Sequence, residues 1–562
     1  MSKIVLIEAF KEAGLVERPD LGCAMLMGAL RNEGIRVTKI GGQENYLPEI
    51  LLHDSREIYS LVNKFSGLKF QKTCSELDLT DFFKFVIDLS NKGFRRYILS
   101  LYQSVEDQKI DVDLLVELDY VFRSIMKLFS LEITISQNLN LGILNRFVKV
   151  IKRENPDFIG FSLMNFDYLS QALRRRISKE IKVKIILGGP LFSVLDSKQL
   201  IDLYKKDYAD FIVIGQGEEA LVSLIKGEVP LEEIPNLLFS RKKKIKINLS
   251  MPIKNLDKLP LPVFPKFKFL QKSFRILPLQ TARGCTWRRC TFCSHHLSYL
   301  KEFNSFSFKR VAEILNYYYD KYGCNFFVLH DEELPSRRAL ALVNVIKDKF
   351  LGKRVFFYGY GRLLGGYNKR ILKQMYQAGF RAMAWGLESG CQKVLDDMQK
   401  GIDLQTAAKV LKNSALVGIK NLCWVMVGFP GETKEEFLET LNFLQKNSRW
   451  ISYVMFSKFE LLINTYLYQH YKQFGLSDLL ESDNSPTVGC KVDKGIKSKE
   501  ALKLISDVLT QKMLGKIKMT TSEFDNLPDF NLSRMIIFKS TVESNPFLVN
   551  GKREAISPTG VK

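Results

Sequence analysis

Short apolar segments alternate with amphipathic helical segments in two separate stretches of the chain, and this alternation constrains the fold more than any other feature. The first series begins at Lys3–Ile7 and resumes at about residue 141 after an interruption, and the second begins at Ile276–Gln280. Apolar strands that alternate with helices favour parallel sheets covered by helices. A chain of 562 residues can form about three to four domains. The sequence therefore predicts an α/β protein with two successive α/β domains.

The spacing of these patterns predicts where the domains lie. Residues 1–255 are expected to form a Rossmann-like domain with a parallel, doubly wound sheet and a helical insertion at about 45–140. The proline-containing segment 256–270 is expected to be a linker. Six strand patterns over 271–475 predict a partial (β/α)6 barrel, a fold whose chemistry lies at the carboxyl ends of its strands. A mixed, basic C-terminal region is expected over 476–562.

Composition excludes two broad classes of protein. With 40 Phe and 21 Tyr residues the chain cannot be largely disordered, and no apolar run reaches the roughly 18 residues of a membrane span. The apolar stretch at the N-terminus is too short for a signal peptide, which predicts a cytoplasmic protein. A net charge of +22 suits an anionic partner, but the basic residues are scattered. A nucleic-acid partner is disfavoured, because its groove would need clustered basic and aromatic residues.

Three of the nine cysteines lie in one loop directly after the first strand of the predicted barrel. Four residues separate Cys285 from Cys290, and two separate Cys290 from Cys293. Several thiolates in one loop suit a soft metal, and three can bind three irons of a [4Fe-4S] cube while the fourth iron stays open. The alternative is a zinc site with His295 or His296 as the fourth ligand. A loop that opens a large barrel favours the cluster, because structural zinc usually stabilises small modules.

The cysteine loop and about 200 residues after it resemble the radical S-adenosylmethionine (radical SAM) superfamily. The resemblance implies that Cys285, Cys290 and Cys293 bind a [4Fe-4S] cluster whose open iron chelates S-adenosylmethionine. It also implies that reduction by an external donor, such as flavodoxin or ferredoxin, cleaves S-adenosylmethionine to a 5′-deoxyadenosyl radical. The usual spacing is three then two residues, so this loop carries one additional residue between its first two cysteines.

Further motifs at the ends of predicted strands resemble the S-adenosylmethionine-binding positions of that superfamily. They lie in His-Asp-Glu-Glu, Gly-Tyr-Gly-Arg, Gly-Leu-Glu-Ser-Gly and Gly-Phe-Pro-Gly-Glu-Thr segments, and an aromatic residue precedes the last cysteine. The resemblance implies cofactor contacts from Phe292, Asp331, Glu332, Arg362, Glu388, Ser389 and Gly428. The Thr433 that ends the last segment is better explained as a helix cap paired with Glu436.

Three motifs in the first domain resemble the cobalamin-binding domain that precedes many radical SAM barrels. They place a small hydroxyl and several glycines after predicted strands, where a nucleotide tail could run close to the backbone. The residues expected to contact cobalamin are Ser162, Leu163, Gly188, Gly189, Gly215 and Gly217. The loop after the first strand has no His to ligate cobalt, as is also found in relatives joined to radical SAM barrels.

The combined resemblance implies a cobalamin-dependent radical SAM methyltransferase that acts on an unactivated carbon of a peptide or natural-product substrate. One S-adenosylmethionine would recharge cobalamin with a methyl group, and a second would give the radical. Two alternatives stay open. The chain could perform cyclisation or rearrangement with a vestigial cobalamin domain, or it could be a zinc-binding, basic nucleic-acid-binding protein. A tRNA methylthiotransferase is disfavoured, because its first domain should bring three more cluster cysteines.

Overall fold

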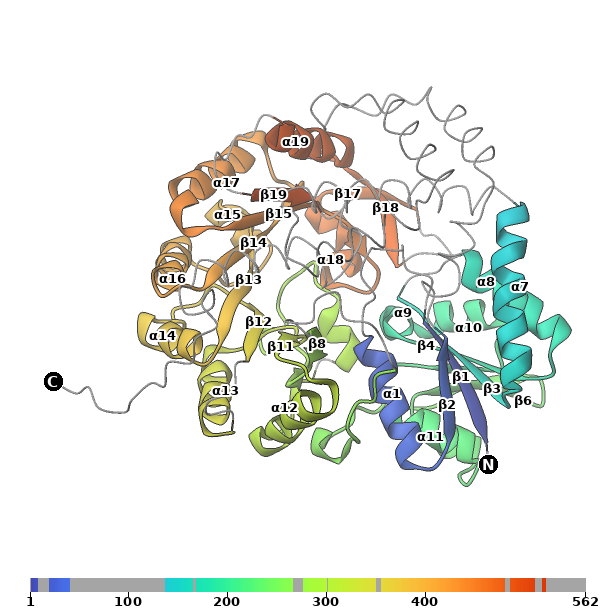
Figure 1. Cartoon of the computed structure of the whole chain (residues 1–562). Helices are drawn as coiled ribbons and strands as arrows, with labels where there is room; N and C mark the ends of the chain where they lie inside the picture. Colours follow the sequence, from blue (N-terminus) through green and yellow to red (C-terminus); the bar gives the residue numbers. More distant parts are fainter. Residues whose placement is uncertain are drawn as a thin grey trace, which may run out of the picture.

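The chain folds around two seven-stranded sheets, one in each half of the molecule (Figure 1). The computed structural model describes residues 2–8, 20–40, 137–164, 168–265, 276–300, 302–349, 355–480, 486–510 and 518–521. Nearly all of the predicted helical insertion lies outside these residues, as does much of the predicted C-terminal region. Within the described residues, no helix is both long and apolar enough to cross a membrane.

The first sheet has the order β2-β1-β3-β4-β5-β6-β7. Its strands are β1 Lys3–Glu8, β2 Arg36–Ile40, β3 Phe158–Ser162, β4 Lys184–Gly188, β5 Phe211–Val213, β6 Leu237–Arg241 and β7 Lys244–Ile247. The first five are parallel, which confirms the predicted core of a Rossmann-like domain. The last two run antiparallel and form an edge hairpin that was not predicted from the sequence. The two-residue turn of the hairpin has positive φ angles at Lys242 and Lys243, as tight hairpin turns require.

Helices cover both faces of the first sheet, which confirms the doubly wound architecture. One face packs against α1 Leu21–Asn32 and α11 Glu218–Lys226 through an apolar cluster that includes Met27 and Leu221. The opposite face packs mainly against three helices, through residues such as Phe147. These helices are α7 Gln137–Glu154, α8 Tyr168–Glu180 and α10 Ser197–Lys206. The carboxyl edge of the parallel strands is left to the connecting loops.

The second sheet is an open, parallel barrel with the order β8-β11-β12-β13-β14-β15-β19. Its strands are β8 Ile276–Leu279, β11 Phe326–Leu329, β12 Phe356–Gly361, β13 Phe380–Glu388, β14 Lys420–Val427, β15 Tyr453–Lys458 and β19 Lys518–Thr521. The first six confirm the predicted barrel strands, and β19 adds a seventh from the C-terminal region. The outer helices are α12 Phe308–Tyr322, α13 Ser336–Lys349, α14 Lys369–Gln377, α16 Leu404–Leu416, α17 Lys434–Lys446 and α19 Ser498–Thr510.

Alternate residues of the barrel strands face opposite sides, as the two-residue period of a strand requires. Phe327, Phe357 and Phe380 belong to the large core under the helices, and their rings stack at centroid distances of 5.3 and 5.2 Å. Their neighbours Phe326 and Phe356 belong to a separate apolar cluster, which lines the concave inner face. The barrel therefore has a packed outer layer and an aromatic interior.

The connection between the two halves is packed rather than free. Its described part contains a short 3-10 helix, Leu256–Lys258, and continues to residue 265. The backbone N–H of Val263 donates to the Ala24 carbonyl of α1 at 2.8 Å. A Cβ on Gly28 would lie 2.2 Å from the Leu261 carbonyl oxygen, so this close approach needs glycine. The segment predicted as a linker therefore holds α1 directly.

A small antiparallel sheet packs beside the mouth of the barrel. It consists of β16 Leu461–Leu462, β18 Thr487–Val492 and β17 Leu476–Leu480, in that order. Its apolar residues share a cluster with Phe429 and with the partly buried Phe292 of the cysteine loop. This sheet therefore covers one side of the predicted cluster site.

Candidate functional site

The cysteine loop begins at a glycine that no other residue could replace. Strand β9, Ala282–Arg283, follows β8 and pairs with β10, Asn304–Ser305. Gly284 then turns the chain with a φ of 87°, and a Cβ at this position would lie 2.0 Å from the Glu302 carbonyl oxygen. Both the positive φ and the lack of space require glycine. The loop thus leaves the sheet in one fixed direction.

The three loop cysteines bring their thiols together without forming a disulfide. All three are free and only partly exposed. Burial raises the pKa of each thiol, and for Cys293 the nearby sulfurs of Cys290 and Cys285 add to this effect, giving a pKa of about 12. Each thiolate of a [4Fe-4S] site binds its own iron, so three neighbouring sulfurs on one loop fit the cluster.

A single zinc ion would need ligands that converge on one point, at about 2.3 Å for each sulfur. Over the described ranges, no group of three or more His, Cys, Asp and Glu side chains is placed to hold one metal ion. His295 begins the 3-10 helix His295–Tyr299. The proposed zinc site therefore gains no support from this geometry.

The additional residue of the loop is accommodated by a tight turn around the first sulfur. Arg288 has a φ of 55°, a left-handed conformation that is uncommon for a residue with a side chain. The Trp287 N–H donates to Cys285 Sγ at 3.4 Å, and the Arg288 N–H also interacts with this sulfur and lowers its pKa. Hydrogen bonds to the sulfurs help to set the reduction potential of an iron–sulfur cluster.

Trp287 fixes the loop on the barrel. Its Nε1 donates to the Gln399 carbonyl at 2.8 Å, and its ring lies so close to Gly401 that a Cβ there would be 2.3 Å from a ring carbon. The Arg362 guanidinium lies 4.3 Å from the ring centroid and also donates to the carbonyls of Lys400 and Gly401. Arg362 was predicted as a cofactor contact, and the structure places it beneath the loop with its buried Nε unpartnered.

A buried ion pair lies beside the second and third cysteines. Lys400 Nζ is 2.7 Å from Glu388 Oε1, and less than a sixth of either side chain is exposed. The Lys400 ammonium lowers the pKa of both Cys290 and Cys293 against the effect of burial. A Cβ on Gly386 would lie 2.8 Å from Lys400 Nζ, so the glycine of the Gly-Leu-Glu-Ser-Gly segment leaves room for the pair.

Sequence reasoning identified Glu388 but missed Lys400. Lys400 follows the short helix α15, Gln392–Asp397, and its ammonium also lies 5.8 Å from the ring centroid of Phe292. The predicted residues Phe292 and Glu388 are thus brought together around a cation that comes from neither motif. The only local signal for this lysine is its position directly before Gly401, which has a positive φ.

The acidic segment after β11 holds the cysteine loop. Asp331 is buried and accepts hydrogen bonds from both the backbone N–H and the hydroxyl of Thr281. Glu332 accepts from the Gly284 N–H at 2.9 Å. Burial raises the pKa of Asp331 and of Glu332 to about 6. Both predicted residues therefore lie at the site, but Asp331 binds the segment that leads into the loop and Glu332 binds the glycine at which the loop begins.

Sequence reasoning missed a third carboxylate in this segment, Glu333. It is buried and accepts from the Thr286 hydroxyl at 2.7 Å and from the Cys285 thiol at 3.4 Å. Its position next to the two predicted acids was a signal for it. Three successive carboxylates thus contact the residues that lead into the loop, its first glycine, and its first cysteine with the following threonine.

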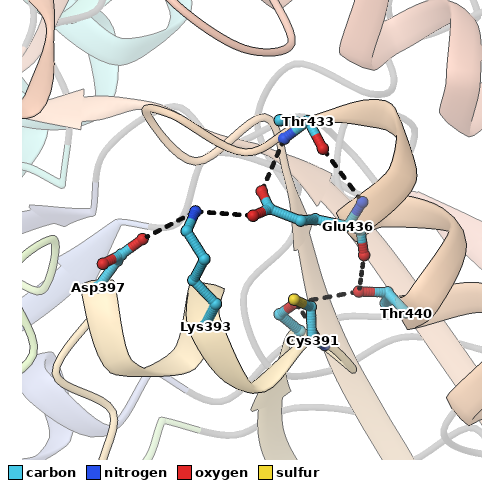
Figure 2. Close-up of polar contacts among 7 residues, drawn as sticks. Cys391, Lys393, Asp397, Thr433, Glu436 and Thr440 are labelled. Carbon is cyan, nitrogen blue, oxygen red and sulfur yellow. Dashed lines mark hydrogen bonds and ion pairs between the residues drawn. The ribbon is translucent and has the colours of Figure 1, made fainter.

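Polar contacts tie the helices that follow the fourth and fifth strands (Figure 2). Thr433 and Glu436 form the predicted capping box at the start of α17. Lys393 of α15 contacts Glu436 at 2.7 Å and Asp397 at 3.7 Å. Thr440 donates to the Glu436 carbonyl. The loops after β13 and β14, which carry predicted cofactor residues, are therefore fixed relative to each other by contacts between α15 and α17.

The remaining predicted residues lie at the same strand ends. Ser389 is buried, and its hydroxyl lies 3.0 Å from that of Thr440, so it joins the loop to α17. Gly428 has a φ of 80°, and its N–H donates to Glu432 Oε2 at 2.6 Å. Glu432 was missed as a site residue. Burial raises its pKa to about 7, and its other oxygen, Oε1, has no hydrogen-bond partner.

The predicted cobalamin residues gather at the carboxyl edge of the first sheet. They lie at the ends of β3, β4 and β5 and at the start of α11, and they are Ser162, Leu163, Gly188, Gly189, Gly215 and Gly217. Gly189 has a φ of 108°, and a Cβ there would lie 2.6 Å from the Leu163 carbonyl oxygen. A Cβ on Gly215 would meet only the Ser298 carbonyl of the barrel half, at 3.8 Å.

A small pocket opens where the edges of the two halves meet. The residues that line it are Ser193, Ile214, Gly215, Gln216, Asn236, Met251, Leu297, Ser298 and Leu300. They come from the ends of the first sheet and from the segment directly after Cys293. Gly215 carries no side chain and so leaves this pocket open.

Comparisons with known proteins support the predicted domain type of each half of the chain. The model of the radical SAM superfamily matches residues 279–444, and the model of the B12 binding domain matches residues 94–225. An uncharacterized methyltransferase of Pyrococcus horikoshii is 26% identical over 308 residues, which cover 53% of this chain and 66% of that protein. A 4′-phospho-dehydrooxetanocin synthase of Priestia megaterium is 25% identical over 163 residues, 27% of this chain and 21% of that protein. The matches thus span less than two thirds of these relatives.

Solved structures share the fold. The radical S-adenosylmethionine methyltransferase TsrM from Kitasatospora setae, solved with cobalamin and a [4Fe-4S] cluster, has a TM-score of 0.61 at 13% identity, covering 97% of this chain and all of that one. The cobalamin-dependent radical enzyme OxsB, solved with aqua-cobalamin, has a TM-score of 0.58 at 14% identity, covering 90% of this chain and 66% of that one. This chain therefore contains a radical SAM domain preceded by a B12-binding domain, and these domains imply a [4Fe-4S] cluster, S-adenosylmethionine and cobalamin as cofactors.

Proposed function

We propose that this enzyme is a cobalamin-dependent methyltransferase that acts on an unactivated carbon of a peptide or other natural-product substrate. The observation that carries the proposal is that the glycine-lined edge of the first sheet adjoins the cysteine loop, with Gly215 against the Ser298 carbonyl. One relative from Pyrococcus horikoshii and the structural neighbour TsrM are both named as methyltransferases, which supports methyl transfer as the reaction class. When bound, the cofactors would supply two groups. One is a carbon-centred radical that removes a hydrogen atom from the substrate, and the other is a methyl group that takes the place of that hydrogen.

The chain's own residues would hold and neutralise these groups. Cys285, Cys290 and Cys293 would bind the cluster, and the buried cations of Lys400 and Arg362 would offset the negative charge of the thiolates. We propose that S-adenosylmethionine contacts Phe292, Asp331, Glu332, Arg362, Glu388, Ser389 and Gly428. We propose that cobalamin contacts Ser162, Leu163, Gly188, Gly189, Gly215 and Gly217.

The inner face of the barrel would exclude water from the reaction. Its buried cluster is apolar and aromatic, and Tyr360 and Trp424 pack against that cluster while keeping some exposure. A radical that abstracts hydrogen from most nearby C–H bonds needs such a dry enclosure. Partly exposed aromatic rings inside the barrel also suit a substrate with an apolar or aromatic part.

The partners and location proposed with this function follow from its chemistry. A one-electron reductant must reach the cluster, and we propose flavodoxin or ferredoxin for this role. A peptide or small molecule is the proposed substrate. We also propose that the enzyme acts in the cytoplasm, where the reducing environment keeps cysteine thiols free.

Anaerobic reconstitution followed by turnover would test the proposal. The protein would be loaded with iron, sulfide and hydroxocobalamin, and the bound amounts measured. It would then be incubated with S-adenosylmethionine labelled in its methyl group, a reductant and candidate substrates. Label in a carbon-bound methyl group, together with 5′-deoxyadenosine, is the expected result. Formation of 5′-deoxyadenosine by protein that binds no corrin would instead favour cyclisation or rearrangement with a vestigial cobalamin domain.

A further inference from the structure

Arg283 lies in the barrel half, two residues before Cys285, but its guanidinium reaches the first domain. Its Nη2 contacts Glu218 Oε1 at 2.5 Å, and its Nη1 donates to Gln216 Oε1 at 2.6 Å. Its Nε donates to Gln280 Oε1 at 2.9 Å within the barrel half. The three guanidinium nitrogens of Arg283 therefore bind acceptors in both halves of the molecule, two in the first domain and one in the barrel half.

The acceptors of Arg283 belong to the segment expected to contact cobalamin. Gln216 and Glu218 flank Gly217, and they directly follow Gly215, whose backbone faces the small pocket between the two halves. The side chains of Arg283 and Glu218 are only 6% and 8% exposed, so water does not compete for this ion pair. Separating a buried pair of this kind is costly, which fixes the position of one partner relative to the other.

The contacts continue from Arg283 into the cysteine loop. Tyr299 and Glu332 lie close enough to interact electrostatically with its guanidinium. Glu332 in turn accepts from the N–H of Gly284, the residue before Cys285. A connected set of buried and partly buried polar groups thus runs from the corrin edge of the first domain to the first cluster cysteine.

We propose that Arg283 is a positioning residue that couples cobalamin binding to cluster assembly. The proposal rests on the proposed function, because it needs both cofactors. A bound cluster holds the cysteine loop, and through Arg283 it holds the Gln216–Glu218 segment in the conformation that binds the corrin. By thermodynamic reciprocity, cobalamin must then favour cluster assembly by the same factor. Another interdomain contact, from Asn464 Nδ2 to the Val194 carbonyl at 2.5 Å, involves neither of these segments.

Titration with hydroxocobalamin tests this coupling without turnover. The dissociation constant would be measured by absorbance for the full chain, once without and once with a reconstituted cluster. We expect hydroxocobalamin to bind at least about fivefold more tightly to cluster-loaded wild-type protein, as is typical of coupled sites. In Arg283→Lys and in Glu218→Gln the two constants should become nearly equal, because lysine cannot contact Gln216 and Glu218 together and glutamine at position 218 loses the ion pair. Glu218→Gln keeps a neutral acceptor of the same shape, so it serves if Arg283→Lys folds poorly.

Arg174→Lys is the matched control. Arg174 forms a buried ion pair of the same 2.5 Å length with Asp207, but both residues lie within the first domain. This variant should keep the wild-type ratio of constants. Equal constants in wild-type protein, or a wild-type ratio in both interface variants, would overturn the coupling while leaving the proposed function intact. Wild-type protein that holds its cluster but binds no hydroxocobalamin would overturn both.

Discussion

Replacing Glu432 by glutamine should change the stability of the barrel in a pH-dependent way. The free energy of unfolding of the variant, minus that of wild type, should be larger at alkaline pH than at acid pH. Glu432 is 1% exposed, and burial raises its pKa from 4.5 to about 7. The Gly428 N–H donates to one carboxyl oxygen at 2.6 Å, but the other oxygen has no hydrogen-bond partner. The folded chain therefore prefers this side chain to be protonated.

The sign and size of the effect follow from this shift. In the unfolded chain the carboxyl loses its proton near pH 4.5, whereas in the folded chain it keeps the proton until about pH 7. The folded state thus holds more protons between these values, and its stability falls as the pH rises through them. The full loss is about 3 kcal/mol and is complete above pH 7. Glutamine carries no titrating proton and can still accept from Gly428, so Glu432→Gln avoids this loss.

Urea unfolding at pH 5 and pH 8 measures the difference. All four tryptophans lie in the barrel half, so their fluorescence reports its unfolding. The free energy of unfolding of Glu432→Gln, minus that of wild type, should rise by about 2.5 kcal/mol between the two pH values, because pH 5 already lies above the unfolded pKa of this carboxyl. Glu439→Gln, at an exposed position on the helix α17 that follows Glu432, is the matched control for a glutamate-to-glutamine change. A rise below about 1 kcal/mol for Glu432→Gln would refute the reasoning.

Three further changes test other parts of the site. In cofactor-free protein, Lys400→Met should lower the free energy of unfolding by about 3–5 kcal/mol, because Glu388 then stays buried without its cation. Adding Glu388→Gln should recover much of this loss in urea unfolding, and no recovery would argue against the ion pair as its cause. Gly189→Ala should lower the melting temperature measured by calorimetry, because a φ of 108° and a backbone carbonyl oxygen 2.6 Å from the added Cβ leave no room for a methyl group. An unchanged melting temperature would contradict that geometry. Cys290→Ala should retain little iron and sulfide after reconstitution, whereas Cys423→Ala, a buried barrel cysteine outside the loop, should retain both. Equal cluster content in these two variants would exclude Cys290 as a ligand.

The apolar pattern predicted most of both sheets because their parallel strands are buried on both faces. The segment Lys3–Ile7 was predicted as a strand, and β1 covers Lys3–Glu8. The edge hairpin was missed for a physical reason. Residues of β7 are alternately exposed, and the turn uses Lys242 and Lys243 in place of the glycine or asparagine that usually marks such a turn.

The site could be predicted only where its chemistry is local. Cys285 and Cys293 lie eight positions apart, so their common role is visible in the sequence. Lys400 and Arg283 act through partners that are 12 and 65 residues away along the chain, and no local pattern signals such pairs. For Asp331 the strand-end position was visible, but its hydrogen bonds to Thr281, which precedes the cysteine loop, follow from tertiary packing.

The position of β1 has a consequence for how this protein is made. This strand lies between β2 and β3, and β3 is synthesised only after roughly 150 further residues, which takes about 8–30 s at ordinary translation rates. During that time one edge of the Lys3–Glu8 strand has no partner, and an unpaired apolar strand readily joins a strand of another chain. The yield of correctly folded protein from a cell should therefore depend on chaperones that protect the nascent N-terminus until residue 162 has left the ribosome.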